Sequence, residues 1–480
     1  MAGGLRAPTE GKSSMPRFVL SRSLCLVGFC GLWSCTKQEA APVAEDKPAF
    51  QQESPPQNTA KADQPLKVET DANGKKTLKL NPQQAEQLAD GLIAKGRLRE
   101  AQQMLSNVIQ ANPKSTTAYV KRAAIMAQSK LLTQAIGDMT KAIALEGNNA
   151  RLRNTRGYFR LSAGEYEAAF QDFSDAIGLD ANFSQAHNNR GLVKVAEKQY
   201  AAGIKDFDQA LKIDSKYIDA HNNKGFALMS LEKYPEAVAE FSAAIALDAK
   251  YVNAWNNRGQ AYLKSQQAEK AIADFSEAIE LTPGNLTYLA ARADAYALAG
   301  KTKEAEADRE RANWLTGLAR LTQQAQQNPK QASVWIARGR HLLSSGELKP
   351  ALADFQRAVT VAPDNVEAHC GCAASLLALG QIDESIAECN AALAKGPSAL
   401  ASSLRGDAYL KKGSLDYAID DYTAAKRRDS QVAQAYKLRA ERSRAEGNAA
   451  QADADLAAAA ELDLSSKAVR QVSNEVPEKN

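Results

Sequence analysis

The chain repeats itself with a period of 34 residues. Between residues 184 and 285 one motif occurs three times: a ring-bearing residue, two asparagines, a basic residue and a glycine. The glycines are Gly191, Gly225 and Gly259, and Gly157 lies a further 34 residues upstream. A fixed period of this length is typical of a solenoid, in which similar units stack and each one contacts only its neighbours.

The unit that begins at Val252 is predicted to be a pair of amphipathic helices. Gly259 in the first helix and Ala271 in the second are small enough for the two backbones to approach closely, and Phe275 fills the space beside them. The unit resembles the tetratricopeptide repeat, whose family pattern places Trp, Gly, Tyr, Ala, Phe, Ala and Pro at the offsets of Trp255, Gly259, Tyr262, Ala271, Phe275, Ala278 and Pro283. The resemblance implies an all-α fold, a right-handed α-solenoid of about eleven helix-turn-helix units.

This pattern fits the chain eleven times. The copies begin near residues 82, 116, 150, 184, 218, 252, 286, 332, 366, 399 and 433. The small residue of the second helix is Ala or Gly in every copy except the ninth, which has Ser385. The large apolar position of that helix holds Arg309 in the seventh copy and Cys389 in the ninth, so we expect these two copies to pack least well.

A second pattern pairs charges between the helices of a unit. In nine copies a basic residue stands immediately before the glycine position, and an acidic residue follows it 16 positions later, as with Arg258 and Asp274. We interpret these residues as ion pairs that brace neighbouring helices, with a ligand-binding role as the alternative. Partly exposed pairs contribute about 0–1 kcal/mol each, so they are expected to set register more than stability.

The repeats fall into two blocks, residues 82–319 with seven copies and residues 332–466 with four. Residues 320–331 lie outside the period and are expected to prolong the preceding helix. That helix should end before Pro329, because the residue before a proline avoids the helical region. We predict altered superhelical curvature at this insertion, and a polar C-terminal cap or tail over residues 467–480.

The first 35 residues resemble the signal peptide of bacterial lipoproteins. The apolar run from Leu24 to Trp33 is far shorter than the roughly 20 residues that span a bilayer. It leads into Leu32-Trp33-Ser34-Cys35, which is similar to a lipobox. The resemblance implies lipidation of Cys35 and a lipid anchor in the bacterial cell envelope, at the outer membrane or the periplasmic face. An ordinary secretory signal, which yields a soluble secreted or periplasmic protein, and an uncleaved anchor are the alternatives.

Residues 36–81 are rich in Ala, Pro, Gln and charged residues and contain few large apolar side chains. Such a segment buries too little surface to offset the entropy lost on ordering. We therefore expect a disordered tether that separates the repeats from the membrane.

The sequence outside this leader consists almost entirely of repeats, so we predict a non-enzymatic protein with no cofactor and no small-molecule substrate. A formal charge of +4 over 480 residues, without a basic patch interleaved with aromatics, argues against nucleic acid. Three of the four histidines, His187, His221 and His369, stand where Trp255 stands in the sixth copy. We interpret them as packing residues rather than metal ligands.

The repeats also contain three cysteines, Cys370, Cys372 and Cys389, whose spacing matches no zinc site. Cys372 and Cys389 take the basic and the aromatic positions of the ninth copy. We interpret them as small core residues, with a disulfide across the helix pair as the alternative in an oxidising compartment.

The paired asparagines are the leading candidates for a binding site. In the family, first helices line a concave groove, and Asn189, Asn223 and Asn257 fall at the offset where O-linked N-acetylglucosamine transferases carry an asparagine ladder that holds a peptide backbone. A primary amide both donates and accepts, so it can satisfy an extended chain without reading its sequence. The alternative is that these amides bond the neighbouring repeat. By the family's lining offsets, the flanking groove candidates are Gln185, Asp219, Asn253, Phe226, Gln260, Met229 and Lys264.

These observations lead to one functional hypothesis and one alternative. We expect an interaction scaffold whose groove binds an extended segment of a partner protein and whose lipid anchor holds it in the cell envelope. The alternative is a structural component of an envelope complex that uses convex or end surfaces. The resemblance extends to the repeats alone, because nothing in the chain resembles the transferase domain.

Overall fold

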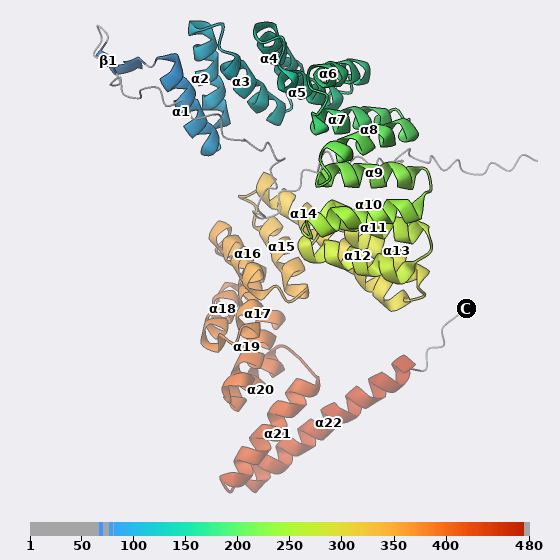
Figure 1. Cartoon of the computed structure of the whole chain (residues 1–480). Helices are drawn as coiled ribbons and strands as arrows, with labels where there is room; N and C mark the ends of the chain where they lie inside the picture. Colours follow the sequence, from blue (N-terminus) through green and yellow to red (C-terminus); the bar gives the residue numbers. More distant parts are fainter. Residues whose placement is uncertain (1–66, 71–75, 80, 475–480) are drawn as a thin grey trace, which may run out of the picture. The chain divides into compact units, whose positions relative to one another are not determined.

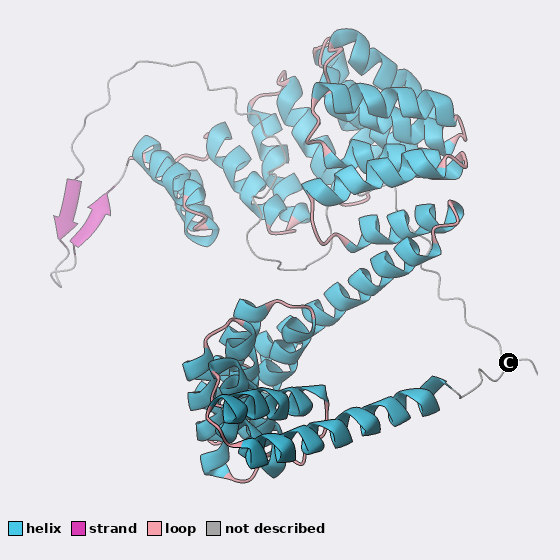
Figure 2. Ribbon diagram, turned by 90° about the horizontal axis from the view of Figure 1, so that it is seen from below, coloured by secondary structure: helices cyan, strands magenta, loops and turns pink. Residues whose placement is uncertain are grey.

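The computed structural model describes residues 67–70, 76–79 and 81–474, and helices account for nearly all of them (Figures 1 and 2). The helices form eleven consecutive pairs. The first helices of the pairs are α1 (Pro82–Ala94), α3 (Thr116–Gln128), α5 (Ala150–Ser162), α7 (Ser184–Ala196), α9 (Ile218–Ser230), α11 (Val252–Lys264), α13 (Leu286–Leu298), α15 (Ala332–Ser344), α17 (Val366–Ala378), α19 (Ala399–Lys412) and α21 (Ser430–Ala445). The second helices are α2 (Leu98–Ala111), α4 (Leu132–Leu145), α6 (Tyr166–Leu179), α8 (Tyr200–Ile213), α10 (Tyr234–Leu247), α12 (Ala268–Leu281), α14 (Thr302–Gln327), α16 (Leu348–Val361), α18 (Ile382–Lys395), α20 (Leu415–Ala424) and α22 (Ala449–Asn474).

The predicted fold class, an all-α helix-turn-helix solenoid, is confirmed. Every first helix except the last begins at the residue that the phasing assigns to it. The exception, α21, begins three residues early, because the side chain of Asp429 accepts hydrogen bonds from the backbone N–H groups of Gln431 and Val432 and caps the helix there. The curvature predicted at the insertion stays a prediction.

Two helices are much longer than the rest. α14 has 26 residues, so its second half occupies most of the segment 320–331, and it ends one residue before Asn328-Pro329. α22 also has 26 residues and runs through Asn474, into the segment predicted to cap the C-terminus.

A short antiparallel hairpin precedes the helices. β1 (Lys67–Thr70) pairs with β2 (Lys76–Lys79), with Val68 opposite Leu78. This differs from the disordered tether expected for residues 36–81. Asn73-Gly74, a strong hairpin-turn signal, lies between the two strands in the sequence and gives the physical reason for the pairing. The rest of the tether up to residue 66, the signal segment 1–35 and its Cys35 lie outside the described residues.

The chain divides into two compact units, and the division falls within α13. The first unit comprises residues 1–283 and 294–301, and the second comprises residues 284–293 and 302–480. In the first unit each helix packs against the next one in the chain, and α5, α7, α9 and α11 also pack against one another, one repeat apart. We call the surface that these four first helices form the first-helix face.

Size complementarity between the two helices of a unit fixes the core. Where the glycine position of the first helix holds Gly, the second helix supplies an aromatic ring. A Cβ atom added to Gly259 would lie 2.8 Å from a ring carbon of Phe275, and one added to Gly191 would lie 2.6 Å from Phe207. The six pairs are Gly157 with Phe173, Gly191 with Phe207, Gly225 with Phe241, Gly259 with Phe275, Gly339 with Phe355, and Gly406 with Tyr422.

The other five copies change both positions together. Each has Ala in place of Gly and a residue without an aromatic ring in place of the ring: Ala89 and Leu105, Ala123 and Met139, Ala293 and Arg309, Ala373 and Cys389, Ala440 and Leu456. The two copies expected to pack poorly fill this position differently, and poor packing of the seventh copy stays a prediction. Arg309 is exposed, whereas Cys389 is fully buried. In these copies the Ala methyl group on the first helix occupies space that, in the other copies, the aromatic ring of the second helix fills.

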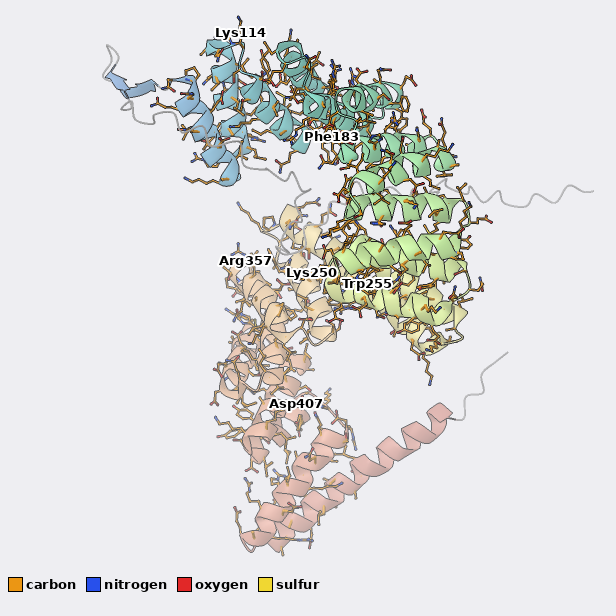
Figure 3. The ribbon with its side chains drawn as sticks, in the orientation of Figure 1. Lys114, Phe183, Lys250, Trp255, Arg357 and Asp407 are labelled. Carbon is orange, nitrogen blue, oxygen red and sulfur yellow. The ribbon has the colours of Figure 1, made fainter. Side chains whose placement is uncertain are left out.

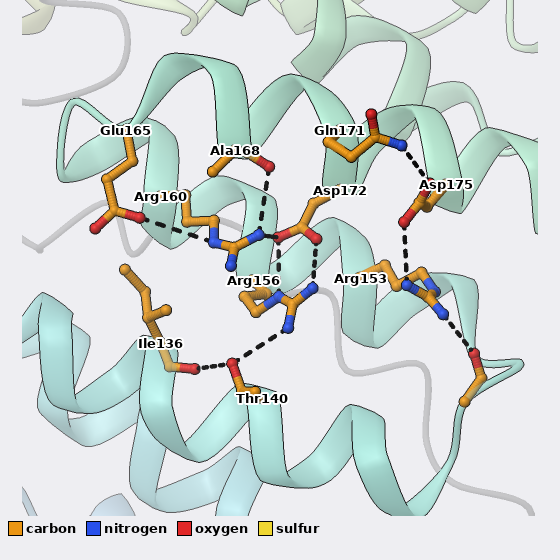
Figure 4. A network of polar contacts seen from close by, with 11 residues as sticks. Ile136, Thr140, Arg153, Arg156, Arg160, Glu165, Ala168, Gln171, Asp172 and Asp175 are labelled. Atoms are coloured by element: carbon orange, nitrogen blue, oxygen red, sulfur yellow. Dashed lines mark hydrogen bonds and ion pairs between the residues drawn. The ribbon is translucent and has the colours of Figure 1, made fainter.

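All nine predicted ion pairs form. Most are bidentate, as between Arg258 and Asp274, where Nε–Oδ2 and Nη2–Oδ1 are both 2.8 Å. In the third copy Asp172 accepts hydrogen bonds from both Arg156 and Arg160, and Arg156 also donates to Thr140 Oγ1 of the preceding repeat (Figure 4). The carboxylates are more buried than those of the partly exposed pairs predicted from the sequence, and Asp172 is 1% exposed. Loss of one partner from such a buried pair costs about 3–5 kcal/mol, so the pairs bear on stability as well as register.

The glycine–aromatic contact makes a prediction about stability. Gly259→Ala should destabilise the first unit by about 1–3 kcal/mol, because its Cβ would overlap the Phe275 ring. Phe275→Leu should offset much of this loss when the two changes are combined, as in the natural pair Ala89 and Leu105. The measurement is the free energy of unfolding from urea titration of the two single variants and the double variant.

Gly137→Ala is the matched control for this experiment. No atom outside its own helix lies within 4 Å of the added Cβ, so this change should stabilise α4 by about 1 kcal/mol through helix propensity alone. Additive effects of Gly259→Ala and Phe275→Leu would contradict the proposed complementarity.

Candidate functional site

The asparagines of the repeated motif form a hydrogen-bonded ladder across the first-helix face. In each rung the second asparagine of a motif donates from Nδ2 to the residue 35 positions earlier, on the preceding first helix. The Nδ2–Oδ1 distances are 3.0 Å from Asn189 to Asn154, 3.0 Å from Asn223 to Asn188, and 2.9 Å from Asn257 to Asn222. The ladder therefore links α5, α7, α9 and α11. The bond to the neighbouring repeat, which was the alternative role for these asparagines, is present in the structure.

We call the side-chain amides of Asn189, Asn223 and Asn257 the outer amides. The bonds of the ladder do not use all of their hydrogen-bond donors and acceptors. Each has two N–H donors and two acceptor lone pairs, and each rung uses one donor. The Oδ1 of Asn189 accepts from Asn188 at 3.3 Å, which uses one of its lone pairs. All three side chains are partly exposed, whereas Asn188 and Asn222 are only 3% and 2% exposed. The outer amides keep a donor and an acceptor for a second partner.

The ladder ends at the sixth copy for a reason that the sequence shows. Asn256 is the next residue in the inner series, and its Oδ1 is buried without a hydrogen-bond partner in the described part of the chain. The seventh copy has Ala291 where the preceding copies have a donor asparagine. The amide series is thus confined to copies three to six.

The flanking candidates lie on the same helices but differ in exposure. Gln185, Asp219 and Lys264 are exposed, and the four others, Asn253, Phe226, Gln260 and Met229, are partly buried. Phe226 and Met229 pack against the core of the fifth copy, beside Leu228 and Phe241. These two side chains therefore serve the core as well as the surface.

Sequence reasoning missed a set of aromatic residues at the start of α7, α9 and α11. The N-cap positions of these helices hold Phe183, Tyr217 and Tyr251, and no side chain caps them. Phe183 is labelled in Figure 3. Seven other first helices begin with a capping side chain: Asn81, Ser115, Asn149, Asn285, Asn365, Ser398 and Asp429. Comparison of the residue before each first helix would have revealed the difference.

Helices with an aromatic N-cap residue lack the stabilising hydrogen bond from a capping side chain to the backbone. Replacement of a capping side chain costs about 1 kcal/mol, and here it is absent from three consecutive helices. The same three copies carry the asparagine pairs. Departures from local stability rules that coincide in this way are typical of functional surfaces.

Asp219 lies among three of the tyrosines of this face. The hydroxyl of Tyr251 donates to Asp219 Oδ1 at 2.8 Å. Burial, and after it the negative charge of Asp219, raises the pKa of Tyr158, Tyr217 and Tyr251 above the ordinary value of a tyrosine. These residues come from α5 and from the starts of α9 and α11, so the fold brings together groups that lie far apart in the sequence.

The histidines occupy the positions predicted for them. Trp255 Nε1 donates to the carbonyl oxygen of Ala249, six residues earlier, at 2.8 Å. His187, His221 and His369 place Nε2 at 3.0–3.2 Å from the carbonyl oxygen at the same spacing. Among the residues described, no group of three or more His, Cys, Asp or Glu side chains is arranged to hold a metal ion.

The cysteines of the ninth copy are buried free thiols. Burial raises the pKa of Cys372 and of Cys389 to about 12, so neither forms the reactive thiolate near neutral pH. Because both thiols are free, the disulfide alternative is not realised in this structure.

A search for a membrane-spanning helix within the described segments found none of sufficient length and apolarity. Two hollows, of about 310 and 370 Å³, lie at turns between helices near Arg97 and Gln267 and are open to solvent. Neither contains a nucleophile paired with a base. The paired helices, the glycine–aromatic contacts and the amide ladder together define a helical-repeat solenoid.

Comparison with protein families identifies the kind of repeat. Models described as "Tetratricopeptide repeat" or "TPR repeat" match residues 87–150, 184–217, 227–266, 252–285 and 342–408. The chain therefore contains tetratricopeptide repeats. A search among curated proteins gave no significant match.

Many solved structures are similar to parts of the chain. YrrB, described as a TPR protein with an unusual peptide-binding site, is 22% identical over 37% of this chain and 91% of its own, with a TM-score of 0.33. PilF of Pseudomonas aeruginosa is 21% identical over 43% and 94%, with a TM-score of 0.38. A tetratricopeptide repeat protein from Parabacteroides merdae is 17% identical over 55% and 99%, with a TM-score of 0.35. Because these TM-scores lie below 0.5, the family models carry the assignment.

The His221–Glu240 pair predicts a pH dependence of stability. His221 Nδ1 lies 2.7 Å from Glu240 Oε2, and this hydrogen bond is the main cause that raises the pKa of His221 above 6.5. Burial alone would raise the pKa of Glu240, but hydrogen bonds from His221 and Lys224 outweigh it and lower that pKa. Because the pKa of His221 is higher in the folded state, its contribution is fully present below about pH 6.5 and is lost as the pH rises through the folded-state value.

We therefore expect the stability advantage of the wild type over His221→Phe to shrink as the pH rises from below about 6.5 through the higher folded-state pKa. Urea unfolding at several pH values measures it. Glu240→Gln is the control background, because it removes the main cause of the shift, so His221→Phe should show a weaker pH dependence there. An advantage of the wild type that does not change with pH would contradict the assigned pair.

Proposed function

We propose that this protein is a non-enzymatic interaction scaffold that binds an extended segment of a partner protein along the first-helix face of copies three to six. The tetratricopeptide repeats support an interaction role in general. The observation that carries the specific proposal is the asparagine ladder, which lines up three primary amides on consecutive first helices and leaves each with a donor and an acceptor. Main-chain N–H and C=O groups of an extended segment are the natural complement of such a row.

The ladder also preorganises the outer amides on the first-helix face for binding. Each outer amide is already oriented by its bond to the inner asparagine of the preceding repeat, so little side-chain freedom remains to be lost. The buried ion pairs and the glycine–aromatic contacts hold the helices that carry these amides. The outer series Asn189, Asn223 and Asn257 would then bond the partner backbone, and the inner series Asn154, Asn188 and Asn222 would position it.

The proposal includes a lipid anchor in the bacterial cell envelope. Its support is the lipobox-like sequence Leu32-Trp33-Ser34-Cys35 at the end of a short apolar run. Residues 36–66 would separate the anchor from the repeats. The partner would in that case be an envelope protein.

A second candidate function is a structural component that assembles through other surfaces. Its support is a row of exposed leucines at one offset near the ends of second helices: Leu145, Leu179 and Leu247, which are 39–42% exposed. Apolar side chains that recur on one edge of a solenoid suit a contact with another subunit. The two candidates use different surfaces, so mutation distinguishes them.

Two triple variants test the scaffold proposal. One changes the outer amides, Asn189, Asn223 and Asn257, to Ala. The probes are peptides selected from a random display library against the wild-type protein, and fluorescence polarisation measures their affinity. The outer variant should lose about tenfold or more, because three hydrogen bonds are worth about 0.5–1.5 kcal/mol each.

The matched control changes the inner amides, Asn154, Asn188 and Asn222, to Ala. Both triple variants break the same three inter-repeat bonds, but the control keeps the amides that face the partner. It should retain most of the affinity while losing comparable stability. Equal losses in the two variants, or no loss in the outer one, would favour the assembly function.

The anchor has a separate test. The intact mass of protein extracted from membranes should correspond to a chain that begins at Cys35 and carries added acyl groups. Cys35→Ser should abolish both the added mass and the membrane fractionation. A mass equal to that of the unprocessed chain would contradict the lipid anchor and leave the scaffold proposal unaffected.

A further inference from the structure

The most distinctive group on the first-helix face is the carboxylate of Asp219. It is exposed on the first turn of α9, and its hydrogen bond comes from the neutral hydroxyl of Tyr251 at 2.8 Å. Among side chains 81–462, whose positions the structure describes, no basic group forms an ion pair with it. Its negative charge is therefore uncompensated at the surface where the partner segment is proposed to bind.

Several other acidic residues on first helices form ion pairs. Asp90 is paired with Lys121 of the next repeat at 2.7 Å, and Glu367 is paired with Arg340. Asp407 accepts from both Arg427 and Tyr422. At Asp219 a tyrosine hydroxyl is the donor instead, as the hydroxyl of Ser115 is at Glu86 of α1.

The surroundings of this carboxylate are aromatic. Tyr217 and Tyr251 occupy N-cap positions where most first helices have a short capping side chain, and Tyr158 of α5 lies within electrostatic reach of Asp219. Aromatic faces attract cations, and they do so more strongly where water is partly excluded. An uncompensated carboxylate among partly buried tyrosine rings is complementary to a basic side chain.

We propose that Asp219, together with Tyr158, Tyr217 and Tyr251, forms a specificity pocket that binds a lysine or arginine side chain of the partner segment. The inference rests on the proposed function and adds sequence selection to it. The asparagine ladder bonds a main chain of any sequence, whereas this pocket selects one basic side chain where the segment passes the fifth copy. This pocket would also set the register of the segment, because main-chain bonding to the ladder alone is the same in every register.

Parallel selections on the full chain test the proposal. A random twelve-residue peptide display library is panned against the wild type, Asp219→Asn and Asp219→Lys. The matched control is Asp420→Asn, which removes an exposed carboxylate of the second helix α20. Circular dichroism confirms that each variant is folded, since Asp219 also lies in the first turn of its helix.

We expect Lys and Arg to be enriched several-fold at one position of the peptides selected by the wild type and by Asp420→Asn. Asp219→Asn should still select peptides but lose that enrichment, and Asp219→Lys should enrich Asp and Glu at the same position. Peptides selected without a basic preference, or with the same preference by Asp219→Asn, would overturn the specificity pocket and leave the scaffold intact. Failure of every protein to enrich any peptide would overturn both.

Discussion

The fit between a glycine on one helix and an aromatic ring on the other is the contact on which the rest of the structure depends. A ring carbon that would lie only 2.6–3.0 Å from an added Cβ leaves no room for any larger residue. The basic residue beside this position reaches the acid of the second helix in copies with glycine and in copies with alanine, as Arg258 does with Asp274 and Arg122 with Asp138. The glycine–aromatic contact also holds together the helix pairs that carry the rungs of the amide ladder.

Copies three to six combine this regular core with an irregular surface. Their glycine–aromatic contacts and buried ion pairs match those of other copies. Three of the four, however, replace a capping side chain with an aromatic residue. These copies also carry the outer asparagines of the ladder and Asp219, which accepts a hydrogen bond from a tyrosine hydroxyl. Because the core contacts stabilise these copies, their surface can carry polar groups and aromatic rings that themselves contribute little to stability. The chemistry of binding is thus confined to a few first helices of a longer scaffold.

The sequence predicted the parts of this structure that repeat. The period fixed where first helices begin, and a separation of 16 residues between Arg258 and Asp274 was enough to identify an ion pair, because one helix pair always brings these offsets together. The asparagines were harder to interpret. Whether Asn223 turns to the partner or to Asn188 depends on the rotation between two repeats, and the period does not specify that rotation.

Other features depended on contacts that no repeat pattern contains. Tyr251 reaches Asp219 across 32 positions of sequence, and only the stacking of α11 on α9 makes that contact. The hairpin of β1 and β2 was missed for a simpler reason. The composition of residues 36–81 outweighed a short local signal, Asn73-Gly74, that predicts a turn. Composition describes a segment on average, whereas a hairpin of eight paired residues is decided by a few of them.

The most direct test of the central claim is a crystal structure of the protein with one of the selected peptides. The account predicts an extended peptide along α5, α7, α9 and α11, with its main-chain N–H and C=O groups bonded to Asn189, Asn223 and Asn257. The rungs to Asn154, Asn188 and Asn222 should remain in place beneath it. A peptide bound to the second helices, or one that leaves these amides bonded only within the ladder, would contradict the account.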